Sequence, residues 1–173
     1  MIVLMAGLPG SGKTTLAQAL AAQTNGVVLN KDVIRSALFA PDEIEYSTGQ
    51  DDFCQKVMLE AASYILGKEP GRMVFLDGRP FSRRYQIEQV MKLASELKQQ
   101  CRIIECVCSD ATARQRLEQQ AAQGEHPAAN RDFGLYLRVK ESFEPISAPA
   151  TVIDTEQPLE VCATQALAVM RRR

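Results

Sequence analysis

The stretch Gly7-Leu8-Pro9-Gly10-Ser11-Gly12-Lys13-Thr14 (GLPGSGKT, residues 7–14) decides the fold. It fits the pattern G-x-x-x-x-G-K-[ST] and lies between an apolar run at 2–6, typical of a strand, and a helical pattern at 14–23. Glycines let such a loop curl until several backbone N–H groups face one anion, and the following helix adds the positive end of its dipole. The sequence therefore predicts a phosphate-binding loop.

Two side chains of this loop have specific expected roles. Lys13 is expected to bridge the terminal phosphates of a nucleotide, and the Thr14 hydroxyl to ligate Mg²⁺. The alternative is a glycine-rich turn that matches the pattern by chance, which the strand and helix in register disfavour. The expected nucleotide-binding residues are Gly7, Leu8, Pro9, Gly10, Ser11, Gly12, Lys13, Thr14 and Thr15.

Apolar runs alternate with helical patterns along the rest of the chain. Further strands are expected at 27–29, 73–76, 103–107 and 151–153, and helices at 32–39, 51–66, 110–123, 131–144, 159–170 and after Ser82, which can cap its helix. Such alternation is typical of a parallel sheet covered by helices on both faces. We therefore expect an α/β fold with three layers (αβα), a central five-stranded parallel sheet and a single domain over 1–173.

Composition narrows the function classes. A chain of 173 residues with 46% hydrophobic and 24% charged residues suits one ordinary globular domain. The net charge of −1 gives no global field that would recruit nucleic acid or a membrane. No apolar run is long enough to span a bilayer, and the N-terminus lacks the basic region of a signal peptide. The five cysteines form no CxxC pair, so reduced core thiols in the cytoplasm are expected rather than a zinc site.

The end of the second expected strand carries the stretch VLNKDVIRSAL (28–38). Ligands of open parallel sheets bind beyond the carboxyl ends of the strands, which is where Asp32 falls. Asn30-Lys31-Asp32 resembles the base-reading motif of GTPases, but it follows too early a strand. Asp32 could instead cap a helix and pair with Arg35, or serve as the base for an acceptor. The residues alone leave these interpretations open.

The third expected strand delivers Asp77 at its end. This carboxylate is placed to hold a water of the Mg²⁺ shell or to orient a basic residue, so Thr14 and Asp77 are the expected metal-site residues. The alternative is an Asp that serves only the following turn. Arg79 and Arg83 lie just beyond and are candidates for substrate binding, or they form part of a solvated face.

A second group of arginines flanks an irregular stretch, GEHPAAN, at 124–130. A helix–loop–helix over roughly 114–134 could form a lid that closes over the nucleotide. Closure would exclude water and bring Arg116 and Arg131 onto the transferring phosphoryl group as catalytic residues. The alternative is a plain helical hairpin with surface charge.

Taken together, these motifs resemble the small P-loop kinases of the P-loop NTPase superfamily. The sequence is most similar to the branch with polynucleotide kinases, zeta toxins and gluconate kinases. In that branch an Asp after the second strand often serves as base for the acceptor hydroxyl, and an Arg three residues later helps to bind the acceptor. The resemblance thus implies that Asp32 is catalytic and that Asp32 and Arg35 contact the acceptor. It also implies an ATP-dependent kinase that uses Mg²⁺.

The lid helix departs from the pattern of the branch. Such kinases commonly carry R-L-x-x-R there, whereas this chain reads Arg116-Leu117-Glu118-Gln119-Gln120. Gln120 replaces the second Arg, and Arg131 is a candidate substitute from across the loop. Three alternatives therefore remain beside the kinase: a nucleoside monophosphate kinase, a GTPase-like switch and a non-catalytic nucleotide-binding module.

The acceptor is not specified by the sequence. The loop at 40–49 and the helix after it are expected to shape its pocket, with Tyr46 as a candidate contact. The expected partners are ATP and a hydroxyl-bearing acceptor, which is a small molecule or a nucleic-acid end, although the net charge does not indicate nucleic acid. No membrane is expected as a partner. Both a monomer and a homodimer fit the sequence.

Overall fold

The structure is a computed structural model that describes residues 1–123 and 132–171. Its strands are β1 (Ile2–Ala6), β2 (Val27–Asn30), β3 (Val74–Asp77), β4 (Cys101–Val107) and β5 (Ala150–Asp154). Its helices are α1 (Lys13–Thr24), α2 (Lys31–Leu38), α3 (Thr48–Lys68), α4 (Arg84–Glu96), α5 (Asp110–Gln123), α6 (Phe133–Glu141) and α7 (Leu159–Met170), with a 3₁₀ turn η1 (Pro41–Glu43).

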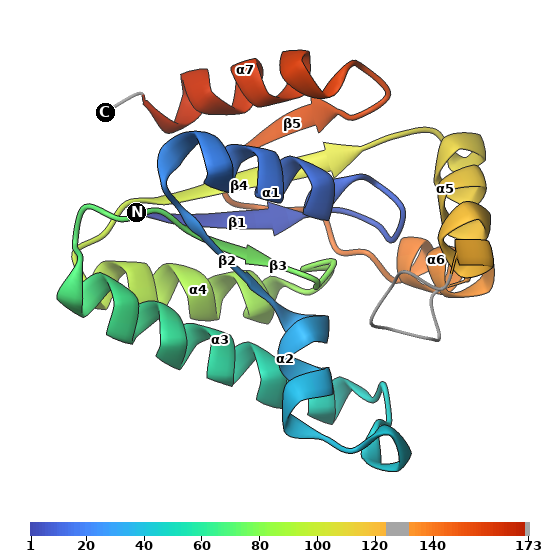
Figure 1. Cartoon of the computed structure of the whole chain (residues 1–173), viewed down its shortest axis with the longest axis horizontal. Coiled ribbons are helices and arrows are strands. Elements are labelled where there is room, and N and C mark those ends of the chain that lie inside the picture. Colours follow the sequence, from blue (N-terminus) through green and yellow to red (C-terminus); the bar gives the residue numbers. More distant parts are fainter. Residues whose placement is uncertain (124–131, 172–173) are drawn as a thin grey trace.

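The five strands form one parallel sheet in the order β2-β3-β1-β4-β5. Helices α1 and α7 cover one face, and α3 and α4 cover the other (Figure 1). The short helix α2 and the pair α5 and α6 lie toward the carboxyl ends of the strands (Figure 1). The predicted three-layer P-loop NTPase fold with a five-stranded parallel sheet is confirmed.

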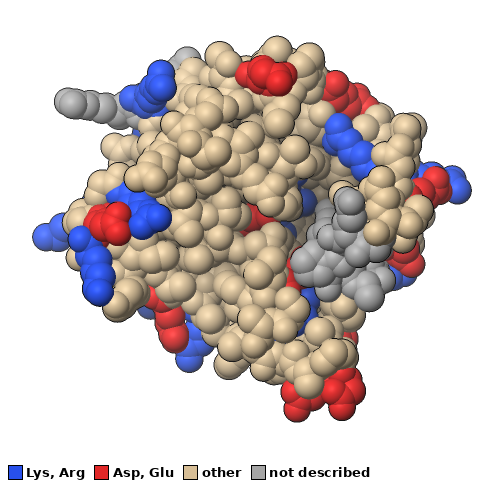
Figure 2. All heavy atoms as spheres, in the orientation of Figure 1, with Lys and Arg blue, Asp and Glu red and all other residues tan. Residues whose placement is uncertain are grey.

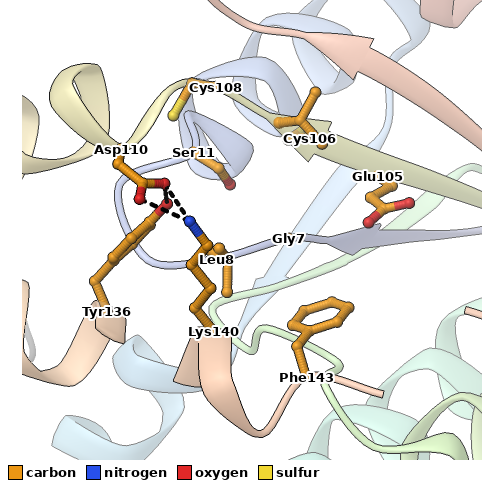
Figure 3. A pocket seen from close by; sticks show the side chains of 11 residues that line it. Gly7, Leu8, Ser11, Glu105, Cys106, Cys108, Asp110, Tyr136, Lys140 and Phe143 are labelled. Carbon is orange, nitrogen blue, oxygen red and sulfur yellow. Dashed lines mark hydrogen bonds and ion pairs between the residues drawn. The ribbon is translucent and has the colours of Figure 1, made fainter. Parts of the chain in front are cut away.

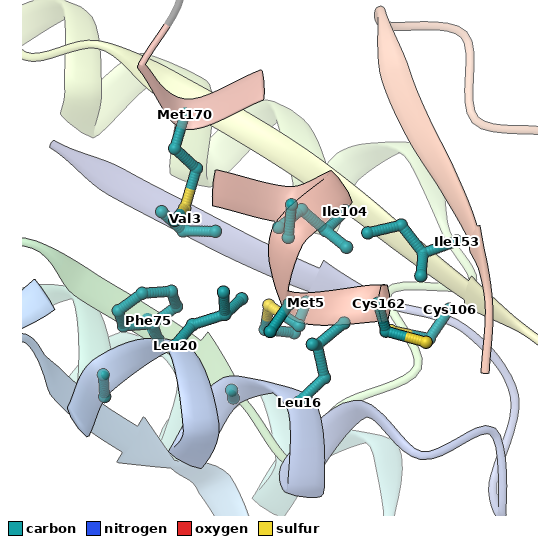
Figure 4. Close-up of a cluster of buried hydrophobic side chains, with 14 residues drawn as sticks. Val3, Met5, Leu16, Leu20, Phe75, Ile104, Cys106, Ile153, Cys162 and Met170 are labelled. Atoms are coloured by element: carbon teal, nitrogen blue, oxygen red, sulfur yellow. The ribbon is translucent and has the colours of Figure 1, made fainter. Parts of the chain in front are cut away.

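The central strand β1 is buried on both faces, which explains its unbroken apolar sequence. Val3 and Met5 point into the core between α1 and α7 (Figure 4), whereas Ile2 and Leu4 belong to the core under α3 and α4. All five cysteines are free thiols. Burial raises the pKa of the Cys106 thiol to about 12, so this residue behaves as a small apolar core residue at neutral pH.

Two predicted helix starts differ from the structure. The residue that caps α4 is Arg83 rather than Ser82, and the Ser82 carbonyl instead accepts a hydrogen bond from the Glu144 N–H at 2.9 Å. The long helix α3 begins at Thr48, inside the predicted 40–49 loop, because the Ser47 hydroxyl accepts a hydrogen bond from the Gln50 N–H.

The helix predicted at 131–144 is shorter than expected. It begins after Asp132, whose carboxylate accepts from the Leu135 N–H, and it ends at Glu141, four residues before Pro145. Residues 124–131, which include the predicted lid loop and Arg131, lie outside the described residues. Within the described ranges, no helix combines the length and the apolar character that crossing a bilayer requires.

Candidate functional site

The loop between β1 and α1 has the backbone of a phosphate cradle. Gly7, Gly10 and Gly12 have φ values of 133°, 78° and 78°, a region that favours glycine. A Cβ at Gly7 would lie 2.3 Å from the Cys106 carbonyl oxygen, so the close approach to β4 requires glycine there. The Lys13 ammonium reaches back across the loop to the Leu8 carbonyl at 2.7 Å. The loop therefore places its lysine over the space that its backbone encloses.

Thr14 meets the end of the third strand. Its hydroxyl donates to Asp77 Oδ2 at 2.8 Å, and Asn30 Nδ2 donates to the same oxygen at 2.7 Å. Asp77 is completely buried, and its Oδ1 has no hydrogen-bond partner among the described residues. A buried carboxylate oxygen without a partner, next to a hydroxyl, is a hard-oxygen donor set of the kind that Mg²⁺ prefers. The residues present therefore fit the predicted metal.

Asn30 organises the end of β2, a role that was not predicted from the sequence. Its Oδ1 accepts hydrogen bonds from the N–H groups of Asp32 (2.9 Å) and Val33 (3.2 Å), so Asn30 is the N-cap of α2. The alternative that Asp32 is the cap is therefore wrong. Because Asn is a favoured N-cap residue, its position directly before the helical pattern was the available signal.

Asp32 is held in a buried ring of charges. Its Oδ1 accepts from Arg35 Nη1 at 2.9 Å and lies 3.2 Å from Lys31 Nζ. The same two cations contact Asp51 Oδ1 of α3, with Lys31 at 2.7 Å. Burial lowers the pKa of Lys31 to about 8, although the neighbouring Asp32 favours its charged form. The two carboxylates balance the two cations, which makes this cluster compatible with burial.

The ring leaves one oxygen of Asp32 available. Both cations contact Oδ1, while Oδ2 has no hydrogen-bond partner among the described residues. The Arg35 guanidinium, only 2% exposed, also lies 5.0 Å from the centre of the Tyr46 ring. The structure thus brings together the three predicted acceptor contacts Asp32, Arg35 and Tyr46.

The other two predicted substrate arginines have different neighbours. Arg79 is 2% exposed and donates to Asp52 Oδ1 (2.6 Å) and Gln55 Oε1 (3.0 Å), so it ties the turn after β3 to α3. Arg83 forms a surface pair with Glu144 at 3.3 Å. These contacts are with α3 and with the segment after α6, and substrate binding by Arg79 and Arg83 stays a prediction.

Arg116 of α5 contacts both the phosphate loop and the segment after β5. Its guanidinium donates to the Thr155 side chain (3.0 Å) and carbonyl (2.7 Å) and to the Gly10 carbonyl (3.4 Å). The Thr155 hydroxyl in turn donates to the Ser11 carbonyl at 2.9 Å. Thr155 lies just after β5, where ligands of open sheets gather, and this position was the signal that could have identified it.

A cavity of about 440 Å³ lies beside this junction, within the size range of small-molecule sites. Gln120 Oε1 is buried next to it and has no partner among the described residues. The cavity has room for a nucleoside next to the phosphate loop. Its lining residues are Gly10, Gly12, Lys13, Thr14, Thr15, Leu16, Arg116, Gln120, Thr155, Gln157, Leu159 and Cys162.

Comparison with known proteins identifies relatives of this architecture. The AAA domain family matches residues 2–146. No curated protein matches the sequence.

Several solved structures superpose over nearly the whole chain. A proposed kinase from Chloroflexus aurantiacus J-10-fl is 22% identical, with a TM-score of 0.74 and coverage of 96% of both chains. A gluconokinase from Sinorhizobium meliloti 1021 is 15% identical, with a TM-score of 0.69 and coverage of 96% of this chain and 89% of the other. The APS kinase of Mycobacterium tuberculosis, solved with AMPPNP and APS, is 15% identical, with a TM-score of 0.74 and coverage of 99% and 97%. At these identities the likeness concerns the fold.

Proposed function

Because this chain belongs to the AAA domain family and has the P-loop NTPase fold, we propose that it is an ATP-dependent phosphotransferase that moves the γ-phosphoryl group to a hydroxyl of an acceptor. One observation carries the proposal. A chain of hydrogen bonds runs from Thr14 through Asp77 and Asn30 to the backbone of Asp32, and so joins the phosphate loop to the candidate base.

In this proposal the phosphates of ATP lie in the phosphate loop, against the backbone N–H groups and Lys13. The nucleoside occupies the cavity of about 440 Å³, where the carboxamide oxygen of Gln120, which has no partner within the described part of the chain, accepts a hydrogen bond from it. The complex of the Mycobacterium tuberculosis APS kinase with AMPPNP supports an adenine nucleotide. Thr14 and Asp77 would hold Mg²⁺, which supplies neutralising charge at the transferring group when it is bound.

Asp32 receives the acceptor hydroxyl through its available Oδ2, while Lys31 and Arg35 fix Oδ1. Phosphoryl transfer passes through a loose transition state, so little proton removal is needed beforehand. The carboxylate therefore acts by orienting the hydroxyl and by taking its proton late in the reaction. Arg35 positions Asp32, and Tyr46 forms a wall of the acceptor site.

Two alternatives are less well supported by the contacts. In a GTPase the Asn-Lys-x-Asp motif reads the base, but here Asn30 caps α2 and bonds to Asp77. In a nucleoside monophosphate kinase, arginines beside the acceptor would grip its phosphate. Here Arg35 and Arg79 are already paired with carboxylates of α2 and α3, which favours a hydroxyl acceptor over a phosphate acceptor.

The surface charge favours a small-molecule acceptor. On the face shown in Figure 2, acidic and basic side chains lie interspersed around the rim, without a continuous basic track for a nucleic-acid backbone. The gluconokinase and APS kinase relatives support the same class. The five free thiols support the reducing environment of a cytoplasmic location.

The test is a screen of hydroxyl-bearing small molecules with γ-labelled ATP and Mg²⁺, in which the label should pass to at least one acceptor. Lys13→Ala should abolish the transfer and leave the fold intact, because Lys13 supplies charge to the transferring group. Normal turnover by a folded Lys13→Ala protein would rule out the proposal. A strong preference for guanine nucleotides in competition binding would favour the switch instead.

A further inference from the structure

A second cavity, of about 280 Å³, lies on the other side of the phosphate loop, between β4 and α6 (Figure 3). In this view Glu105 and Phe143 flank one end, and Asp110, Tyr136 and Lys140 lie together at the other. None of these side chains has a part in the proposed phosphoryl transfer. The lining residues are Gly7, Leu8, Ser11, Glu105, Cys106, Val107, Cys108, Asp110, Tyr136, Lys140 and Phe143.

Glu105 is an unusual residue for its place in the fold. It lies on β4, an interior strand paired with β1 on one side and β5 on the other, between the buried residues Ile104 and Cys106. Glu105 is half-buried, and interior parallel strands are normally apolar throughout, because a carboxylate placed there loses part of its hydration. Desolvation raises the pKa of Glu105. Among the described residues no hydrogen bond or ion pair offsets this cost.

The remaining charges of the cavity already neutralise each other. Lys140 Nζ contacts both carboxylate oxygens of Asp110, at 2.6 and 2.7 Å, and the Tyr136 hydroxyl donates to Oδ1 at 2.6 Å. The lining thus holds two carboxylates, Glu105 and Asp110, against one ammonium group. The unbalanced charge is negative and belongs to Glu105.

The rest of the wall defines the shape of a ligand that would balance this charge. Leu8 and Val107 are apolar, and the Phe143 ring lies across the cavity from Glu105 (Figure 3). A carboxylate and an aromatic face together bind an organic ammonium group well, the first by ion pairing and the second by cation–π attraction. A sugar or another neutral polyol would leave most of its hydroxyls facing apolar groups, at a cost in binding free energy.

We propose that this cavity is a second ligand site, for a small organic amine that places its ammonium group on Glu105 and its apolar body against Leu8 and Phe143. The site lies next to the nucleotide site. The Leu8 carbonyl is the hydrogen-bond acceptor of Lys13 Nζ at 2.7 Å, and Ser11 Oγ lies 3.4 Å from the same nitrogen. An amine that packs on this part of the loop changes the affinity for nucleotide, and by linkage nucleotide changes the affinity for amine by the same factor.

The experiment uses the full chain and two isosteric probes, benzylamine and benzyl alcohol, followed by two-dimensional NMR and calorimetry. Benzylamine should shift resonances of Leu8, Glu105 and Phe143, and the alcohol should bind at least roughly tenfold more weakly, because a charge-assisted contact is lost. Glu105→Gln should weaken the binding of benzylamine by a similar factor. Glu60→Gln, at an exposed position of α3, is the matched control and should bind as the wild type does.

A carbon-13 titration of the carboxylates gives a second readout that does not depend on the variant. Benzylamine should lower the pKa of Glu105 toward its ordinary value, because the cation stabilises the charged form. The proposal is overturned if benzylamine does not bind, if the alcohol binds equally well, or if Glu105→Gln leaves the affinity unchanged. It is also overturned if the pKa does not move. None of these readouts uses phosphoryl transfer, so they are independent of the proposed reaction.

Discussion

At the scale of single residues, the two carboxylate oxygens of Asp32 differ. Oδ1 is held by two cations, and Oδ2 has no hydrogen-bond partner among the described residues. Lys31 and Arg35 both contact Oδ1, and Asp51 shares both cations from the facing helix. Asp51 therefore balances the second of the two buried cations, so that the two carboxylates and the two cations together satisfy each other's charge.

Asp32→Asn should slow phosphoryl transfer by roughly 10²–10⁴-fold, because an amide cannot take the acceptor proton. It should also lower the free energy of unfolding by on the order of 1–3 kcal/mol, since Lys31 and Arg35 lose a charged partner. Asp51→Asn is the control, because it disturbs the same two cations and keeps Asp32. We expect it to lose similar stability in urea unfolding but to retain most of the transfer rate. Equal rates for the two variants would show that Asp32 is not the base.

Gln120 of α5 is the residue at which this chain departs from the kinase pattern R-L-x-x-R. Among the described residues its buried oxygen has no partner, and it lies beside the cavity proposed for the nucleoside, so Gln120→Ala should weaken ATP binding by about three- to tenfold, the value of one hydrogen bond. Gln119→Ala, one position along α5 and exposed, is the matched control for calorimetric titration with ATP. Unchanged ATP affinity in Gln120→Ala would place the nucleoside elsewhere.

At the scale of the elements, the start of α2 couples helix capping to the proposed metal site. Asn30 satisfies two N–H groups of the helix with one atom and holds Asp77 with the other. The turn after β3 fits closely around this cap, since a Cβ at Gly78 would lie 2.8 Å from both Asn30 Oδ1 and the Lys31 backbone nitrogen. A change at Asn30 thus affects both the helix and the carboxylate that faces Thr14.

Asn30→Ala should lower stability by about 1 kcal/mol through the lost cap, and it should also raise the Mg²⁺ concentration needed for half-maximal turnover. Ser47→Ala removes the equivalent cap of α3, whose hydroxyl accepts from the Gln50 N–H, and provides the comparison. Both variants should unfold at lower urea concentrations, but only Asn30→Ala should shift the Mg²⁺ dependence. An identical Mg²⁺ dependence in the two variants would separate the cap from the metal site.

At the scale of the whole molecule, the parallel sheet brings the carboxyl ends of β1, β2 and β3 to one edge, where charged side chains lie close together. Lys31 faces Asp32, Arg35, Asp51 and Arg79, and desolvation lowers its pKa from 10.5 to about 8. Above pH 8 the folded protein has released this proton while the unfolded chain still holds it. Stability should therefore rise with pH between about 8 and 10.5, by up to about 1.4 kcal/mol per pH unit.

The measurement is the free energy of urea unfolding of wild type and Lys31→Met between pH 7 and 10. The wild type should gain stability relative to Lys31→Met above pH 8, and below pH 8 the difference should be flat. Lys56→Met, at an exposed position of α3, should show a constant difference from wild type across the range. A constant difference for Lys31→Met as well would mean that Lys31 stays charged in the fold.

The sequence by itself determined the phosphate loop, the order of strands and helices along the chain, and the parallel character of the sheet. Each of these follows from local spacing. The glycines of 7–14 let the backbone curl around an anion, and apolar runs between helical patterns form buried strands. Local spacing also placed Asp32 and Asp77 at strand ends, on the edge where ligands gather.

Only the tertiary structure decided which partners these residues have. Asn30 rather than Asp32 caps α2 and also bonds to the distant Asp77. Asp51 completes the ring around Asp32 from a distant helix, and Glu105 faces a cavity with no partner in the part of the chain that the structure describes. Asp32 and Asp51 are 19 positions apart, and Thr14 and Asp77 are 63 apart. The energy of a buried charge depends on every group packed around it, and that set is fixed by the fold rather than by the neighbouring sequence.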